Sequence, residues 1–151
     1  MSLLDNQYAT IGRQAYFVIF EKIAHDLVAK GATKKELEDA YYTTLTEQMS
    51  PMEIPDLFRN EWNLIPHIHE TPFYCYAYAW GNLLVLALYN KYKKEGNAFV
   101  EKYIKLLSYG ESKSPKDMLA ELGINPSDEK FWQSGFDLIK EEIEDLKGLT
   151  K

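Results

Sequence analysis

The stretch from Pro66 to Gly81, PHIHETPFYCYAYAWG, gathers side chains that could do chemistry. It holds two histidines, a glutamate, three alternating tyrosines and the only cysteine of the chain. Tyrosine hydroxyls and histidine nitrogens can donate hydrogen bonds to a substrate or to a developing oxyanion. The pattern therefore indicates a polar site, and the rest of the chain must supply the elements that position it.

The tyrosines of this stretch fall at helical spacing. Tyr74 and Tyr78 share one face of a helix, whereas Phe73, Tyr76 and Trp80 share another. Phenol donors beside the positive end of a helix dipole suit an anion or an oxyanion. The alternative is a core helix whose hydroxyls bond to backbone carbonyls.

The histidines come just before these tyrosines. His67 and His69 are one residue apart, so in an extended segment both point to the same side. Such a pair could bind zinc with a third ligand, but His25 is the only other histidine and HETPF lacks the second histidine of His-Glu-x-x-His. Histidine as a hydrogen-bond donor to a substrate is the favoured interpretation.

Cys75 lies inside the same apolar stretch. Apolar surroundings raise a thiol pKa, so packing is favoured over a role as nucleophile. No Gly-rich phosphate loop, Gly-x-Ser-x-Gly or Cys-x-x-Cys occurs in the sequence.

Composition limits the class of protein. A chain of 151 residues with 46% hydrophobic and 26% charged residues predicts a single globular domain over 1–151. A net charge of −6 makes nucleic acid and anionic membrane surfaces unfavourable partners. One cysteine and no signal-peptide pattern predict a cytoplasmic protein.

The residues from Thr71 to Asn90 carry no charge. Twenty uncharged positions match the length of a membrane span. Four tyrosines and Asn82 within the run favour a buried central helix instead.

The spacing of apolar residues predicts an all-α fold, with five or six helices packed around a long buried central helix at about 72–95. Thr33 and Glu36 form a capping box, and Thr71 with Pro72 at the first helical position begins the central helix. The other predicted helices run over about 5–30, 33–48, 99–108, 115–123 and 128–147, with a short helical turn near 57–63.

Residues 62–146 resemble the C-terminal part of the oligoendopeptidase F family of zinc metallopeptidases, relatives of thimet oligopeptidase. The resemblance rests on WNLIPHIHETPFYCYAYAWGNLLVLALYNKYKKEG, YIKLLSYGESKSPKDMLAELGI and FWQSGFDLIKEEIEDL. The Pro-His…Pro-Phe-Tyr-x-Tyr block is the specific part, because its order and spacing are unusual. The first sixty residues are similar more loosely, chiefly through GRQAYFVIFEKIAHDL at 12–27.

The resemblance implies a helical peptidase that cleaves short peptides inside a deep channel. In that family a His-Glu-x-x-His helix and a later glutamate hold one zinc, which activates a water. Tyr76 resembles the tyrosine that donates to the oxyanion, and His67 resembles the histidine that contacts the substrate or intermediate, so both are predicted catalytic residues. His69, Tyr74 and Tyr78 resemble neighbouring residues and are predicted to bind substrate.

The chain departs from the family in having no His-Glu-x-x-His. We therefore expect the C-terminal portion of a zinc metalloendopeptidase, inactive alone, with no metal ligands or cofactor of its own. Its expected partners are short peptides, a zinc-bearing N-terminal half and a second copy of the chain. The alternative is a non-catalytic helical module for peptide binding or assembly.

Overall fold

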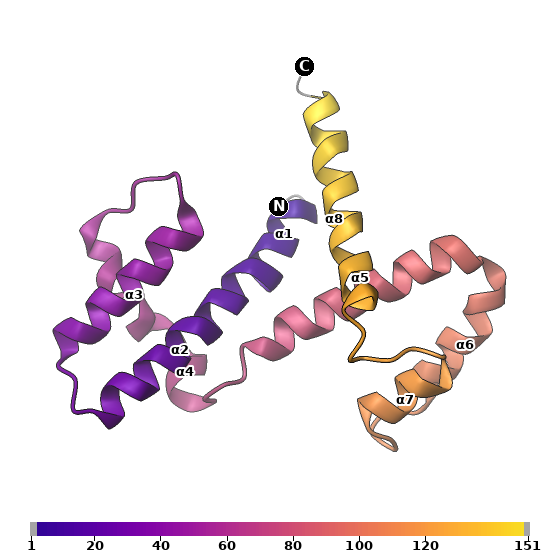
Figure 1. Ribbon diagram of the computed structural model, residues 1–151, viewed down its shortest axis with the longest axis horizontal. Coiled ribbons are helices and arrows are strands. Elements are labelled where there is room, and N and C mark those ends of the chain that lie inside the picture. Colours follow the sequence, from indigo (N-terminus) through magenta and orange to yellow (C-terminus); the bar gives the residue numbers. More distant parts are fainter. Residues whose placement is uncertain (1–2, 150–151) are drawn as a thin grey trace. The chain divides into compact units, whose positions relative to one another are not determined.

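The computed structural model describes residues 3–149, and every regular element in this range is a helix (Figure 1). The predicted all-α class is confirmed. The elements are α1 (Leu3–Gln7), η1 (a π-helix, Tyr8–Gly12), α2 (Arg13–Ala29), α3 (Lys34–Met49), η2 (a 3₁₀-helix, Asp56–Leu64), α4 (Pro66–Glu70), α5 (Tyr76–Glu95), α6 (Asn97–Ser108), α7 (Pro115–Glu121) and α8 (Glu129–Leu149).

The chain divides into two compact units, Met1–Trp80 and Gly81–Lys151, called here the first and second units. The prediction of one domain over 1–151 stays a prediction. Within the described residues no helix combines the length and the apolar character needed to cross a membrane.

The first unit is built on α2 and α3, which pack against each other (Figure 1). Its core contains Phe17 and Phe20 from α2, Tyr41 and Leu45 from α3, and Cys75. The ring of Tyr41 meets that of Phe20 edge-on, with centroids 4.9 Å apart. This core supports the segment that carries the histidines and tyrosines, because Ile65 and Ile68 pack against it.

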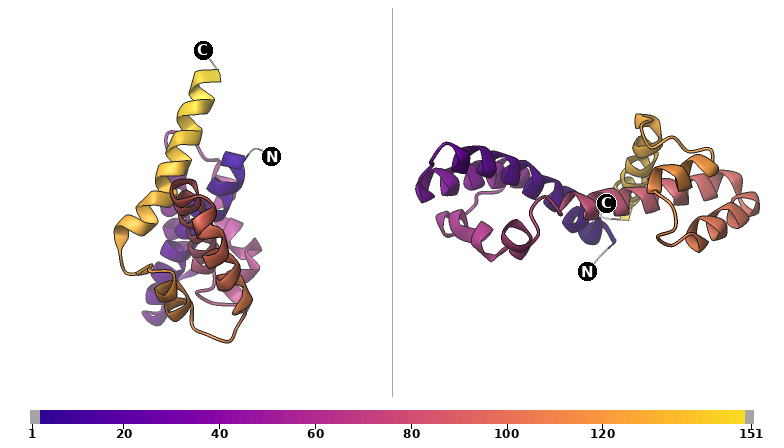
Figure 2. Two further views of the ribbon diagram at one scale, coloured as in Figure 1. Left: turned by 90° about the vertical axis from the view of Figure 1, so that its right-hand side faces the viewer. Right: turned by 90° about the horizontal axis from the view of Figure 1, so that it is seen from below.

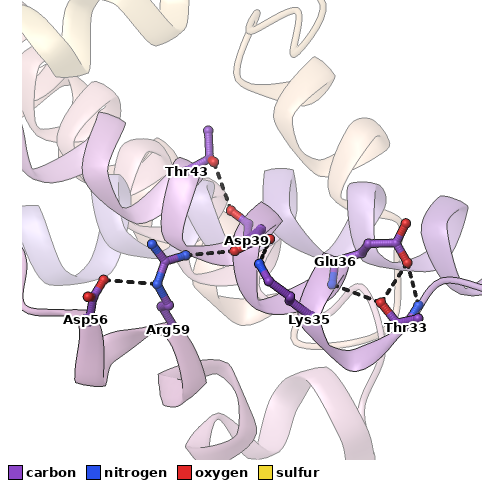
Figure 3. A network of polar contacts seen from close by, with 7 residues as sticks. All are labelled: Thr33, Lys35, Glu36, Asp39, Thr43, Asp56 and Arg59. Atoms are coloured by element: carbon purple, nitrogen blue, oxygen red, sulfur yellow. Dashed lines mark hydrogen bonds and ion pairs between the residues drawn. The ribbon is translucent and has the colours of Figure 1, made fainter.

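Helix α3 begins at the predicted capping box, which the structure confirms. The Thr33 hydroxyl accepts from the Glu36 N–H, and the Glu36 carboxylate accepts from the Thr33 N–H at 2.7 Å. One turn further on, Asp39 pairs with Lys35 and also with Arg59 of η2 (Figure 3). These pairs tie η2 to α3.

A less exposed network makes a second tie to η2. Arg13 donates to Oε1 of Glu61 at 2.6 Å, and the Tyr41 hydroxyl donates to Oε2 of Glu61 at 2.7 Å. Burial, together with the hydrogen bond to Glu61, raises the pKa of Tyr41 well above its usual value. The network therefore holds η2, the element that directly precedes α4.

The second unit has an apolar core where α5, α6 and α7 meet (Figure 2). Leu88 of α5, Phe99 of α6 and Leu119 of α7 are buried there, with Leu122 and Ile124 from the segment after α7. Phe131 of α8 packs against the same core.

Helices α5 and α8 approach closely at Gly135. A Cβ atom at this position would lie 3.1 Å from the Leu83 carbonyl oxygen and 3.3 Å from the Leu86 Cβ. Beside it, the Asn90 side-chain amide donates to the Ser134 carbonyl at 2.7 Å. The contact is therefore between a backbone and a helix face, with a hydrogen bond next to it.

The predicted start of the central helix is wrong, and its predicted central position is not confirmed. Helix α5 begins at Tyr76 instead of Pro72, because Phe73 has a φ of 61°, which no right-handed helix can contain. The predicted packing of the other helices around it is not confirmed, since Val85 and Tyr89 are 60% and 55% exposed. The other predicted helices are confirmed within a few residues at each end.

Candidate functional site

Three of the predicted site residues form an aromatic cluster of His67, Tyr74 and Tyr78 in the first unit. The rings of His67 and Tyr74 are nearly parallel, at 6° with centroids 6.0 Å apart. Tyr78 stands edge-on to both rings, with centroids 5.4 Å from each. Tyr74 and Tyr78 are 48% and 37% exposed, so a ligand can reach the cluster.

A hydrogen bond joins two members of the aromatic cluster. Nε2 of His67 lies 2.8 Å from the Tyr78 hydroxyl oxygen. Which group donates depends on the histidine tautomer. In either case the bond fixes the imidazole against the phenol and leaves a donor available to a third group.

Local structure explains why these rings meet. Pro66 occupies the first position of α4, where its missing N–H costs nothing, so a helix rather than an extended segment carries the histidines. The extended arrangement, in which both histidines would point to the same side, is therefore not formed. In a helix, residues two apart lie on different faces, and only His67 is directed to the tyrosines.

His69 and Tyr76 lie outside the aromatic cluster. The His69 ring faces Trp62, with centroids 5.8 Å apart. Tyr76, the first residue of α5, is 60% exposed, and its hydroxyl makes no hydrogen bond to another residue in the described range. The structure thus brings together three of the five predicted residues.

The segment between α4 and α5 is a tight turn. The Tyr74 N–H donates to the Thr71 carbonyl at 3.2 Å, and Phe73 inside the turn has a positive φ. The Phe73 N–H donates to Oε1 of Glu21 in α2 at 2.6 Å, and its ring lies 4.6 Å from that of His25. The turn is therefore held by side chains from a helix some fifty residues earlier.

Sequence reasoning missed Glu21, although a signal was present. Phe17, Phe20 and Glu21 fall at helical spacing on the core-facing side of α2, and all three are buried. A carboxylate on such an apolar face needs a partner. That pattern indicates a buried polar contact without naming the Phe73 N–H as its donor.

Cys75 is fully buried, as expected from its apolar neighbours. Burial raises the pKa of its thiol, and the negative charge of Glu21 raises it further. A thiol with a raised pKa stays protonated near neutral pH, which agrees with packing rather than nucleophilic chemistry.

The described residues do not fit a metal site. Between residues 3 and 149 no three His, Cys, Asp or Glu side chains are placed to hold a metal ion together. Each histidine has its own aromatic neighbour: His25 lies against Phe73, His67 against the two tyrosines of the cluster, and His69 against Trp62. The three histidines thus pack against different aromatic partners.

Residues 2–138 match the model of Peptidase family M3, so the match includes the aromatic cluster, the turn and Glu21. The chain belongs to peptidase family M3. Peptidases of this family are zinc-dependent and act on peptides. The predicted family resemblance is confirmed.

Named relatives agree with this assignment. This M3 chain is 31% identical to an oligoendopeptidase F homolog of Borreliella burgdorferi over 150 residues, which cover 97% of the chain and 25% of the relative. It is 28% identical to oligopeptidase PepF of Bacillus subtilis, covering 97% of the chain and 22% of the relative. It is also 28% identical to the chromosomal oligoendopeptidase F of Lactococcus lactis subsp. cremoris, covering 98% and 25%.

The M3 chain thus spans about a quarter of the length of these relatives. No solved structure matches it.

Proposed function

We propose that this M3 chain supplies substrate-binding and oxyanion-stabilising side chains for the hydrolysis of short peptides. The observation that carries the proposal is the exposed aromatic cluster with its His67–Tyr78 hydrogen bond, placed just before and within the first turn of α5. Exposed donors held in fixed directions are what a peptide carbonyl requires.

Tyr76 is the proposed oxyanion donor. Its exposed hydroxyl is free to meet a substrate, unlike that of Tyr78, which is bonded to His67. It also stands at the start of α5, where the positive end of the helix dipole favours a developing negative charge.

The remaining roles follow from the same geometry. His67, oriented by Tyr78, would contact the substrate or the tetrahedral intermediate. Tyr74 and Tyr78 offer ring faces and hydroxyls to a peptide, and His69 with Trp62 would extend the binding surface on the other face of α4.

The zinc ion that this family uses would be held by another segment, because the described residues do not fit a zinc site. The proposed partner of this chain is therefore a zinc-bearing segment, either the N-terminal half of a longer peptidase or a separate chain. The chain alone then hydrolyses no peptide. Its own residues bind and orient the substrate and stabilise charge.

A chimera tests the proposal. The matched quarter of the Borreliella burgdorferi relative is replaced by these 151 residues, and hydrolysis of a short fluorogenic peptide is followed. In an active chimera, Tyr76→Phe should lower kcat by about 10²–10³-fold, the usual effect of deleting one oxyanion donor. KM should change little, since that hydrogen bond strengthens in the transition state.

Tyr89→Phe is the matched control, because Tyr89 is also an exposed tyrosine of α5 and lies outside the aromatic cluster. It should leave kcat unchanged. An active chimera indifferent to Tyr76→Phe would remove the role of that hydroxyl. Peptide hydrolysis or tight stoichiometric zinc in the isolated chain would contradict the proposed division of labour.

The alternative function, an assembly module, has one observation in its favour. The second unit has an apolar cavity of about 320 Å³ between α5 and α6. It is lined by Val85, Leu88, Tyr89, Tyr92, Phe99, Val100 and Tyr103. Its proposed occupant is a second copy of the chain in a symmetric dimer.

Sedimentation equilibrium tests the dimer. Self-association that Tyr103→Glu abolishes would support it, since a carboxylate in the cavity opposes apolar contact. A clean monomer at high concentration would contradict it.

A further inference from the structure

Glu21 is a buried carboxylate that the proposed function does not use. We propose that Glu21 is a positioning residue: it selects the left-handed conformation of Phe73 and thereby sets the aromatic cluster of His67, Tyr74 and Tyr78. The catalytic consequence of this proposal rests on the proposed function of the cluster, whereas its structural part does not.

The turn before α5 has an unusual residue at its third position. The turn from Thr71 to Tyr74 is closed by a hydrogen bond from the Tyr74 N–H to the Thr71 carbonyl. Its second residue is a proline and its third has a positive φ, which is the pattern of a type II turn. That third position favours glycine or asparagine, because a side chain strains the left-handed conformation. Phe73 occupies it, so another interaction must compensate.

Glu21 supplies this interaction. The Phe73 N–H donates to Oε1 of Glu21 at 2.6 Å, a charge-assisted hydrogen bond. Type I and type II turns differ by a flip of the peptide between the second and third residues. In the type I form the Phe73 N–H would point away from Glu21 and leave the carboxylate unpaired.

The Glu21 carboxylate is expected to lower the stability of the fold. Glu21 is fully buried, and within residues 3–149 its Oε2 has no hydrogen-bond partner. A buried charge with incomplete hydrogen bonding lowers stability relative to an apolar side chain of similar shape. A positioning role accounts for a residue that packing alone would replace.

The turn controls the aromatic cluster because it is directly joined to it. Phe73 is bonded to Tyr74, whose ring stacks on His67, and Cys75 is buried two residues on. A flipped Pro72–Phe73 peptide would redirect the chain entering α5. The stack and the His67–Tyr78 bond would then lose their alignment.

Glu21→Met in the 151-residue chain is the decisive variant, because it keeps the length of the side chain and removes the acceptor. Nuclear magnetic resonance should show loss of the strong Overhauser effect between Pro72 Hα and the Phe73 N–H that marks a type II turn. Contacts between the His67 and Tyr78 rings should weaken. The thermal midpoint should stay equal or rise, which a merely structural role does not predict.

Glu36→Met is the matched control. Glu36 belongs to the α3 capping box in the same unit and touches none of the residues of the turn. This variant should lower the thermal midpoint and leave the Phe73 and His67 signals in place. The two glutamates should therefore show opposite patterns of stability and local structure.

Phe73→Gly tests the reason for the effect. Glycine adopts a positive φ without strain, so the turn no longer needs the carboxylate. In the chimera, Glu21→Met should lower kcat by about 10–100-fold when Phe73 is present, the scale expected of misplaced groups. In the Phe73→Gly background it should lower kcat by less than about twofold.

The outcomes separate the two proposals. If the Overhauser effect and ring contacts survive Glu21→Met, or if Phe73→Gly gives no rescue, the positioning role is wrong. If the turn changes as expected while the kcat of an active chimera is unaffected, the aromatic cluster does not contribute to catalysis and the proposed function fails. An inactive chimera leaves the resonance measurements on the isolated chain to decide the role of Glu21.

Discussion

The two units of the chain place their polar side chains differently. Among the described residues, the first unit buries Gln7, Glu21 and Thr44, whereas the second buries only Asn90. The first unit also holds Tyr41, a buried tyrosine whose hydroxyl donates to Glu61. Some hydrogen bonds of the first unit thus lie in or beside its core, whereas that between Lys35 and Asp39 is exposed.

The second unit places its charged network outside. Glu121 of α7 accepts from Tyr109 and pairs with Lys105 and Lys113 in exposed contacts. Lys105 belongs to α6, whereas Tyr109 and Lys113 lie between α6 and α7. Exposed pairs contribute little to stability, whereas buried hydrogen bonds have strict geometry. The first unit thus buries more polar side chains than the second, and its buried hydrogen bonds fix the orientation of the groups that they join.

The largest expected effects on stability come from core packing, and here the two units should respond alike. Phe20 in the first unit and Phe99 in the second are almost completely buried. Phe20→Ala and Phe99→Ala should each lower the free energy of unfolding by about 3–5 kcal/mol, from lost transfer energy and a cavity. Urea denaturation measures both, and a loss much smaller in one unit would show a loosely packed core there.

A pair of Tyr→Phe variants sharpens the comparison. Tyr41→Phe removes a buried hydroxyl that donates to the Glu61 carboxylate, so unfolding free energy should fall by about 1.5–3 kcal/mol. Tyr109→Phe removes an exposed bond of the same chemistry to Glu121 and should cost less. Equal losses in urea denaturation would break the proposed distinction between the units.

The smallest effect is a pH dependence in the second unit. Hydrogen bonds from Lys113, Tyr109 and Lys105 lower the pKa of Glu121 from 4.5 to about 2. Because the folded pKa is below the unfolded one, this contribution is complete above pH 4.5 and is lost as the pH falls towards 2. The thermal midpoint should decline over that interval.

Glu121→Gln is the control for that decline. The variant should start lower at neutral pH and show a shallower decline below pH 4.5, since other carboxylates still titrate. Parallel curves for both proteins would show that Glu121 makes no contribution.

Local signals predicted most helices because their ends are encoded locally. Thr33 and Glu36 form the capping box within one turn, and Ser114 with Pro115 starts α7 as expected. Such ends depend on residues within four positions of each other. No tertiary contact is needed to read them.

The start of α5 could not be predicted in this way. Thr71 followed by Pro72 is a good helix start, but proline is also common at the second position of a type II turn. The choice was made by Glu21, far away in the sequence, through its bond to the Phe73 N–H. A tertiary contact therefore overrode a correct reading of local preference.

The candidate site was predicted in part. Residue types and the family resemblance gave His67, Tyr74 and Tyr78, which the structure brings together. They could not give the directions of His69 and Tyr76, because those depend on where α4 and α5 begin. The functional roles of all five residues stay predictions.

The close approach at Gly135 sets the separation of α5 and α8. With hydrogen in place of a methyl group, the α8 backbone lies close to the Leu83 carbonyl of α5 without crowding it. Even alanine at position 135 would push the two helices apart and lengthen the neighbouring hydrogen bond from Asn90 to the Ser134 carbonyl. The absence of a Cβ atom thus favours one register of the two helices, since sliding by a turn would bring a side chain into this tight contact.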